Sequence, residues 1–293
     1  LGFNFYAVAA ESLIFDGQLK TIEQSDIDRF PYLSYLDEFL SNYMSIFELK
    51  CCLSSLEEYN VDYYLIDGSI YGDLQNPFPK GVETSAKAKK ELISATLNDF
   101  EEMVKNPSDK SVYSPKLFNK YFKIYQEYKY PYTLYLTTIE RLVVLKEILK
   151  NSRKMIAISK SSSNNDIFHS NMPDIAIFDK YTQKEGISKV IRKKVSKDIN
   201  TTFPVFDEFF KDLKFTIFYL RLADYKNVLK VELPYEASMA EIEEIATKLK
   251  KFSTNGYPYL LKKAHNDVVI SDKNIKELIN IAKVREKSGR EML

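Results

Sequence analysis

The chain has 293 residues, 45% of them hydrophobic, and its 42 Lys and Arg residues nearly balance 41 Asp and Glu. This length suits one large domain or two ordinary ones with a sizeable core. No apolar run approaches the length of a membrane-spanning helix, and the near-neutral charge restricts any nucleic-acid site to a local basic patch. Cys51 and Cys52 are adjacent and poorly placed to pair, which indicates reduced thiols and a cytoplasmic location.

The amino-terminal part predicts strand, helix and strand in that order. Aromatic and aliphatic residues predict one or two strands over Phe3 to Phe15, and Asp16-Gly17 predicts a turn after them. The polar stretch "SDIDRFP" predicts a loop. Apolar residues at helical spacing predict a helix over residues 33–58. The run from Val61 to Ile66 then predicts a buried strand.

The middle of the chain is mainly helical in pattern from Glu83 to Leu149. Apolar residues recur at steps of three and four after Thr84 or Ser85, either of which is a suitable N-cap. A second helix runs through "TTIERLVVLKEILK". We expect residues 80–150 to form a helical insertion between strands of a single domain that spans residues 1–293.

Strands return in the last part of the chain, at "KMIAISK" and "DIAIFDKY". The segments "LKFTIFYLRL" and "NVLKVELP" predict a hairpin around Ala223-Asp224-Tyr225. A helix is predicted from about Met239 to Phe252, and a last helix opens near Asp272. Strands mixed with helices in this way predict an α/β fold with a mixed β-sheet core flanked by helices.

Asp67 follows the strand in "VDYYLIDGS" and allows two interpretations. Asp-Gly is a common turn signal, but open sheets also carry their functional groups at the carboxyl ends of strands. If a helix runs from Glu48 to about Glu58 and the following strand returns antiparallel to it over a similar length, Glu48 and Asp67 lie at the same end of the two elements. Two carboxylates there could hold Mg²⁺ or Mn²⁺, although Glu48 is equally a solvated helix residue.

Three further residues could join the carboxylates. Lys160 ends the strand "MIAIS" and could stabilise a phosphate or a developing charge. His265, in "KKAHNDVVIS", could be a metal ligand or proton donor. Tyr257, in "GYP", could present a fixed hydroxyl. Each also has an ordinary interpretation, as a strand-end lysine, a helix-surface histidine and a packing tyrosine. His169 lies in a polar loop and is interpreted as incidental.

The remaining motifs narrow the chemistry. The sequence has no zinc-ligand spacing, GxGxxG motif, phosphate loop or defensible Ser-His-Asp order. A carboxylate pair with a lysine and a histidine suits metal-assisted phosphodiester hydrolysis. The basic stretch "KVIRKKVSK" suits phosphate contacts or is only a solvated face. Candidate DNA-binding residues are Lys160, Arg192, Lys193, Lys194, Lys262 and Lys263.

In order along the chain, "YAVAAESLIF", "YYLIDGS", "AISKSS", "PDIAIFDKYTQKEGISKVI", "FTIFYLRL" and "GYPYLLKKAHNDV" resemble the NurA nuclease family of archaea. The resemblance spans nearly the whole chain. It implies an RNase H-like core and a manganese-dependent DNA nuclease. It also implies a homodimer around a central channel that works with the hexameric translocase HerA in double-strand break resection. The expected activities are 5′–3′ exonuclease and single-strand endonuclease on single-stranded DNA and duplex ends.

By this resemblance, Glu48 matches the family's helix glutamate, and Asp67 matches its second aspartate. Lys160, Tyr257 and His265 match the lysine, tyrosine and histidine that complete the site, and Glu48, Asp67 and His265 are the expected metal ligands. The family's earlier aspartate, in an Asp-Gly motif on a first strand, is expected upstream of Leu1, with the family's first strand and helix. Its absence here favours the alternative of a non-catalytic DNA-binding or clamp subunit that keeps the fold.

Overall fold

The structure is a computed structural model that describes residues 3–31, 36–75, 77, 85–199 and 202–281. The strands are β1 (Phe3–Phe15), β2 (Leu19–Pro31), β3 (Tyr64–Asp67), β4 (Met155–Ser159), β5 (Gly186–Ile187), β6 (Ile191–Lys194), β7 (Lys214–Arg221), β8 (Leu229–Leu233), β9 (Ser253–Thr254) and β10 (Tyr257–Pro258). The α-helices are α1 (Leu36–Glu58), α2 (Ile70–Gln75), α3 (Ala86–Met103), α4 (Ser114–Tyr121), α5 (Lys129–Leu149), α6 (Asp174–Tyr181), α7 (Val195–Asp198), α8 (Asp207–Asp212), α9 (Met239–Lys251), α10 (Tyr259–Asp267) and α11 (Asp272–Ile281).

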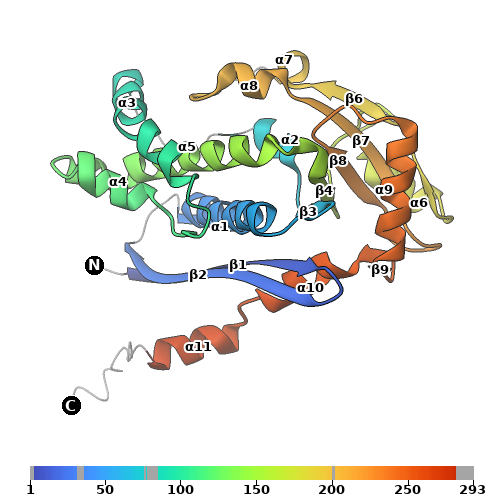
Figure 1. Ribbon diagram of the computed structural model, residues 1–293, viewed down its shortest axis with the longest axis horizontal. Helices are drawn as coiled ribbons and strands as arrows, with labels where there is room; N and C mark the ends of the chain where they lie inside the picture. The colour runs from blue at the N-terminus through green and yellow to red at the C-terminus, as the bar shows by residue number, and fades with distance from the viewer. Residues whose placement is uncertain (1–2, 32–35, 76, 78–84, 200–201, 282–293) are drawn as a thin grey trace.

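A mixed sheet forms the centre of the molecule, in the order β3-β4-β8-β7-β5, with β6 also pairing with β7 (Figure 1). β3 and β4 are parallel, and the other pairs are antiparallel. β7 and β8 form the predicted hairpin. The prediction of an α/β fold with a mixed sheet flanked by helices is therefore confirmed.

The sheet separates two hydrophobic cores because its central strands are buried on both faces. Successive residues of β4 point to opposite faces. Met155 and Ala157 pack with α1 and α5 on one side, whereas Ile156 and Ile158 pack with α9 on the other. The result is a layer of helices, the sheet, and a second helical layer (Figure 1).

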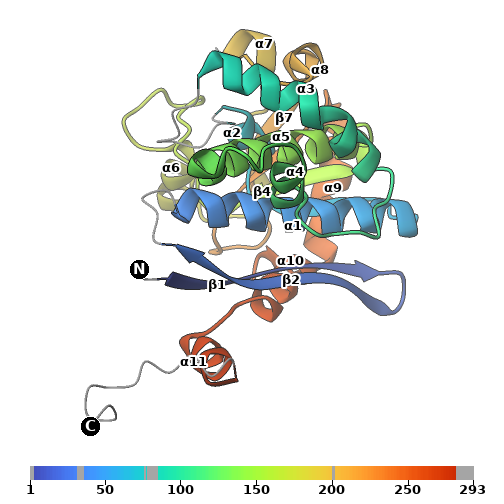
Figure 2. The ribbon, with the colours of Figure 1, turned by 90° about the vertical axis from the view of Figure 1, so that its left-hand side faces the viewer.

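A long antiparallel hairpin, β1–β2, lies outside this sheet and packs against α1 (Figure 2). The predicted Asp16-Gly17 turn is confirmed, and Gly17 has a φ of +98° that favours glycine. Tyr6, Val8 and Ala10 alternate along β1 toward α1, and α10 also contacts β1. The loop predicted for "SDIDRFP" is wrong, since these residues pair with β1 as the end of β2.

The strand predicted at "DIAIFDKY" is also wrong, because this segment is helix α6. A short apolar run does not distinguish strand from helix by itself. Asp174 opens the helix and accepts hydrogen bonds from the backbone N–H groups of Ile167 and Phe168 at 2.9 and 3.1 Å. Ile175 and Phe178 then face a small core with Tyr219. The strand predicted from Val61 begins later, at Tyr64.

Helices α3, α4 and α5 occupy the chain between α2 and β4. Ser85 caps α3 through its side chain, which confirms one of the two predicted N-caps. The predicted helices α9 and α11 open where expected, α9 with a reciprocal capping box between Ser238 and Glu241. Among the described helices, none has the length and apolarity to cross a membrane.

Candidate functional site

Asp67 ends β3 beside the parallel strand β4, where the carboxyl ends of both strands meet. Gly68 follows with a φ of +136°, a conformation that favours glycine. Its N–H donates to Ile158 at 2.9 Å, and its carbonyl accepts from the Ser159 hydroxyl at 2.8 Å. The turn is therefore tied to β4 through its backbone and leaves the Asp67 side chain exposed.

Lys160 and Tyr257 both reach Asp67. The Lys160 ammonium lies 3.3 Å from one Asp67 carboxylate oxygen. The Tyr257 hydroxyl donates to the other oxygen at 3.4 Å. The ammonium also lies 4.6 Å from the centre of the Tyr257 ring. Burial and the negative charge of Asp67 raise the pKa of Tyr257, so this side chain stays a neutral hydrogen-bond donor.

Glu48, on α1, is electrostatically coupled to Asp67. Its side chain reaches solvent, but enough protein surrounds the carboxyl to disfavour its charged form. Desolvation, followed by the charges of Asp67 and Asp73, raises the pKa of Glu48 from 4.5 to about 7. A cation between Glu48 and Asp67 would relieve the repulsion. That the two carboxylates hold a metal stays a prediction.

Asp73 is a further carboxylate whose charge acts on Glu48, and our interpretation of the sequence did not include it. It lies on α2, where burial raises its pKa and the charge of Arg141 lowers it. The signal in the sequence was a second acidic residue six positions after Asp67 in "DGSIYGD". A one-and-a-half-turn helix after the Gly68 turn brings Asp73 back toward Glu48.

The donor set fits a hard divalent cation in part. Carboxylate oxygens are the ligands that Mg²⁺ and Mn²⁺ prefer, and such ions often keep water or phosphate oxygens in their other positions. Within the described ranges, however, no three His, Cys, Asp or Glu side chains come together closely enough to hold an ion. Glu48 and Asp67 are thus the residues that would hold a metal, with room for further ligands.

His265 lies on the exposed side of α10. This helix contacts β3, the strand that ends in Asp67. None of the described residues forms a hydrogen bond or ion pair with the His265 side chain. The structure therefore places the histidine on an element beside the site without joining it to the carboxylates. His169 lies in the loop after β4 with a φ of 50°, and its N–H donates to the Asn165 carbonyl.

The candidate DNA-binding residues fall into two groups. Lys262 is exposed and has no ion pair in the described part of the chain. The other five have protein partners. Lys160 pairs with Asp67, Arg192 donates to the Ala237 carbonyl at 2.9 Å, and Lys193, Lys194 and Lys263 pair with Asp166, Asp212 and Asp267. Within the basic stretch at 189–197, Lys193 and Lys194 thus pair with aspartates, whereas Lys189, Arg192 and Lys197 are exposed and have no ion pair among the described residues.

Carboxylates, a lysine and a tyrosine gathered at the carboxyl ends of two parallel strands suit an enzyme that uses a divalent metal on phosphate esters. The chain belongs to the NurA family, since the NurA domain model matches residues 1–270. A curated relative from Saccharolobus solfataricus, the DNA double-strand break repair nuclease NurA, is 29% identical. That similarity covers 94% of this chain and 74% of the relative.

Solved structures of NurA proteins share the fold. The crystal structure of the NurA nuclease from Sulfolobus solfataricus matches with a TM-score of 0.70 and 23% identity, over 96% of this chain and 82% of that one. A crystal structure of NurA bound to dAMP and manganese matches with a TM-score of 0.62 and 14% identity, over 99% and 89% of the two chains. NurA membership, which the sequence resemblance predicts, is confirmed.

Proposed function

We propose that this chain is a manganese-dependent deoxyribonuclease in which Glu48 and Asp67 hold the metal. The observation that carries the proposal is the contact of Lys160 and Tyr257 with Asp67 at the carboxyl end of β3. The charge of Asp67 also raises the pKa of the Glu48 carboxyl. The dAMP and manganese bound to a NurA protein of the same fold support the choice of substrate and metal. Mg²⁺ is the alternative cation, because it prefers the same oxygen donors.

Each side chain has a role that follows from its position. When bound, the metal would supply an activated water and stabilise the leaving oxygen. Glu48 and Asp67 would hold that ion, and the exposed Lys160 ammonium would offer a positive charge to the scissile phosphate. Tyr257 donates a hydrogen bond that fixes the Asp67 carboxylate. His265, beside the site on α10, is a further candidate ligand or proton donor.

The biological setting is part of the same proposal. The chain would act in DNA end resection for double-strand break repair and homologous recombination, as 5′–3′ exonuclease and single-strand endonuclease. It would form a homodimer around a channel for DNA and work with the hexameric translocase HerA in the cytoplasm. Family membership and the name of the curated relative support the repair context.

The deciding experiment is a cleavage assay on single-stranded DNA and duplex ends with Mn²⁺, with Mg²⁺ and with EDTA. We expect cleavage with Mn²⁺ and none with EDTA. Asp67→Asn should lower the rate on the order of 10³-fold, because it removes a metal-ligand charge, with fold and DNA binding retained. Asp62→Asn is the matched control, since Asp62 is an exposed aspartate just before the same strand.

Two outcomes would contradict the proposal. Cleavage that survives EDTA would exclude metal-assisted hydrolysis, and near-wild-type activity of Asp67→Asn would return Asp67 to a turn residue. DNA binding without any cleavage would favour the second candidate, a non-catalytic DNA-binding or clamp subunit. This candidate is favoured because, among the described residues, no three His, Cys, Asp or Glu side chains lie close enough together to hold a metal ion.

A further inference from the structure

Two charged residues of β8 form an ion pair in the interior, directly behind the Asp67 turn. The Lys230 ammonium and the Glu232 carboxylate lie 2.7 Å apart, and the two residues are only 2% and 0% exposed. They stand two positions apart on the strand, so both point to the same face of the sheet. Removing two charges from water is unfavourable, and an apolar pair of similar volume often stabilises a fold as well. The burial of Lys230 and Glu232 therefore points to a role beyond general stability.

Glu232 holds the segment that follows Asp67. One carboxylate oxygen accepts from the Ser69 hydroxyl at 2.5 Å, and the other accepts from the Tyr71 N–H at 2.9 Å. The Ser69 oxygen accepts in turn from the Gly72 N–H at 2.8 Å. The first turn of α2 is thus fixed on Glu232, and this turn sets where Asp67 and Asp73 stand.

Lys230 holds the segment that follows Lys160. Its ammonium donates to the Asn164 side-chain oxygen at 3.0 Å. The Ser162 hydroxyl donates to the same oxygen at 2.8 Å. The loop that begins at Lys160 is therefore tied to the ion pair from the other side. Asp67 and Lys160, which contact each other at the surface, each precede a segment that is anchored on one member of the pair.

We infer that Glu232 and Lys230 are positioning residues, which hold the Asp67 turn and the Lys160 loop in register for metal binding. The inference rests on the proposed function, although its structural part can be tested without metal or DNA. The pair touches neither substrate nor the reacting atoms. It acts through Ser69, Tyr71 and Asn164, as outer hydrogen-bond partners tune a metal site through its ligands.

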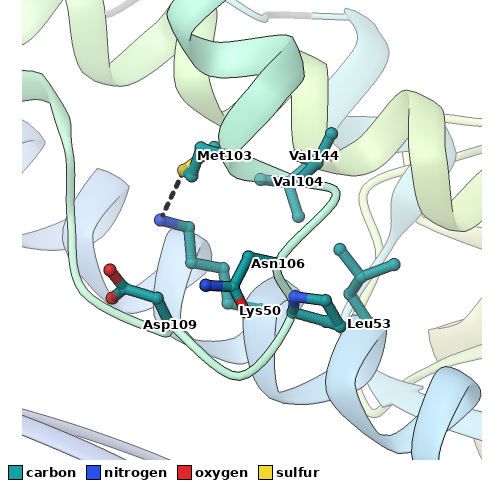
Figure 3. A pocket seen from close by; sticks show the side chains of 8 residues that line it. Lys50, Leu53, Met103, Val104, Asn106, Asp109 and Val144 are labelled. Atoms are coloured by element: carbon teal, nitrogen blue, oxygen red, sulfur yellow. Dashed lines mark hydrogen bonds between the residues drawn. The ribbon is translucent and has the colours of Figure 1, made fainter.

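The chain offers a matched control in a second buried pair, Lys50 and Glu140, 2.6 Å apart between α1 and α5. Glu140 likewise binds the start of a helix, because its carboxylate accepts hydrogen bonds from the N–H groups of Tyr113, just before α4, and of Ser114, the first residue of α4. Lys50 also donates to Met103 at 3.0 Å and borders a small cavity (Figure 3). This pair has the same chemistry as Lys230–Glu232 but supports the α3–α4 helices.

The test compares Glu232→Gln with Glu140→Gln in the full chain. Hydrogen exchange of the metal-free proteins is the first readout. Glu232→Gln should accelerate exchange at residues 69–73 and 161–164 and leave 113–118 unchanged, whereas Glu140→Gln should do the reverse. Mn²⁺ binding by calorimetry is the second readout. The dissociation constant of Mn²⁺ should rise on the order of 10-fold in Glu232→Gln. It should stay within about twofold in Glu140→Gln, because Glu140 binds the start of α4 and not the segments that follow Asp67 and Lys160.

Two further variants keep the test decisive if Glu232→Gln fails to fold. Ser69→Ala removes the hydroxyl link without leaving a buried charge unpaired, and Glu232→Gln with Lys230→Met keeps the site neutral. Both should weaken Mn²⁺ binding. Unchanged exchange at 69–73 in all three variants, or equal loss of Mn²⁺ binding in Glu140→Gln, would overturn the inference. A wild-type chain that binds Mn²⁺ but cleaves no DNA would refute the proposed function and leave the exchange result to decide the positioning role.

Discussion

The Glu48 carboxylate is destabilising in the metal-free protein. Its pKa is about 7 because burial and the charges of Asp67 and Asp73 disfavour the ionised form. The folded protein therefore binds a proton at pH values where the unfolded chain has already released it. The free energy of unfolding must then fall as the pH rises from about 4.5 to about 7.

Replacing Glu48 with Gln should abolish activity yet stabilise the metal-free fold at high pH. At pH 8 we expect the free energy of unfolding of the variant to exceed that of the wild type by on the order of 1 kcal/mol. This value is discounted because the Glu48 side chain also meets solvent. At pH 4 the difference should vanish, since both side chains are then uncharged. Urea unfolding in EDTA at the two pH values measures this. Glu57→Gln, at an exposed position of the same helix, should show no such gain, and a wild type more stable than Glu48→Gln at pH 8 would contradict the argument.

Local pattern singled out Glu48, Asp67, Lys160 and Tyr257 only one by one, because strand ends and turns are encoded in short segments. The family resemblance supplied the link across the chain that made them one candidate site. The buried partners were not predictable in this way. Lys230 and Glu232 alternate with apolar residues in "VLKVELP", a pattern typical of a strand with one solvated face. Only the tertiary packing shows that their face is interior.

At the scale of elements, the two wrong predictions have separate physical origins. β2 is polar because most of its outward side chains meet solvent, and its conformation is fixed by pairing with β1 rather than by its own composition. α6 carries a β-like run of apolar residues, but Asp174 organises the preceding loop and starts a helix. In contrast, α1, α5 and α9 carry their own periodicity and were predicted.

Helix α9, which covers one face of the sheet, depends on its capping box. The Ser238 hydroxyl accepts from the Glu241 N–H at 3.3 Å, and the Glu241 carboxylate accepts from the Ser238 N–H at 2.8 Å. Ser238→Ala should lower the free energy of unfolding by about 1 kcal/mol. Thermal unfolding measures the loss, and Ser238→Asp, which keeps a capping oxygen, should recover most of it. Equal stability of the alanine and aspartate variants would show that the cap is unimportant.

At the scale of the whole molecule, a chain of net charge +1 must gather its positive side chains on one surface to bind DNA. Lys193, Lys194 and Lys263 pair with aspartates of the same chain. Lys160 pairs with Asp67 in the site, whereas Lys262, exposed on helix α10, has no ion pair among the described residues. A second copy that faces the first across a channel would double the number of these lysines.

Lys262→Ala should therefore weaken DNA binding on all sequences alike and reduce the salt slope of the affinity by about one unit per subunit contact. Lys193→Ala is the comparison variant. Because Asp166 already neutralises Lys193 at 2.8 Å, it should leave the slope unchanged. Binding titrations across a range of salt concentrations test both, and sedimentation at micromolar concentration tests the dimer. A monomer, or equal slopes in both variants and the wild type, would refute the channel.

The contact between Tyr257 and Asp67 joins residues that are 190 positions apart, and α10 closes on β1, the first strand described. On the ribosome, Glu48, Asp67 and Lys160 emerge long before Tyr257 and α10. A nascent chain thus presents its carboxylates without the hydroxyl that fixes Asp67 and with the outer face of the β1–β2 hairpin uncovered. The proposed nuclease site is therefore assembled only at the end of synthesis. A chain that is truncated before Tyr257 would be released with an incomplete site.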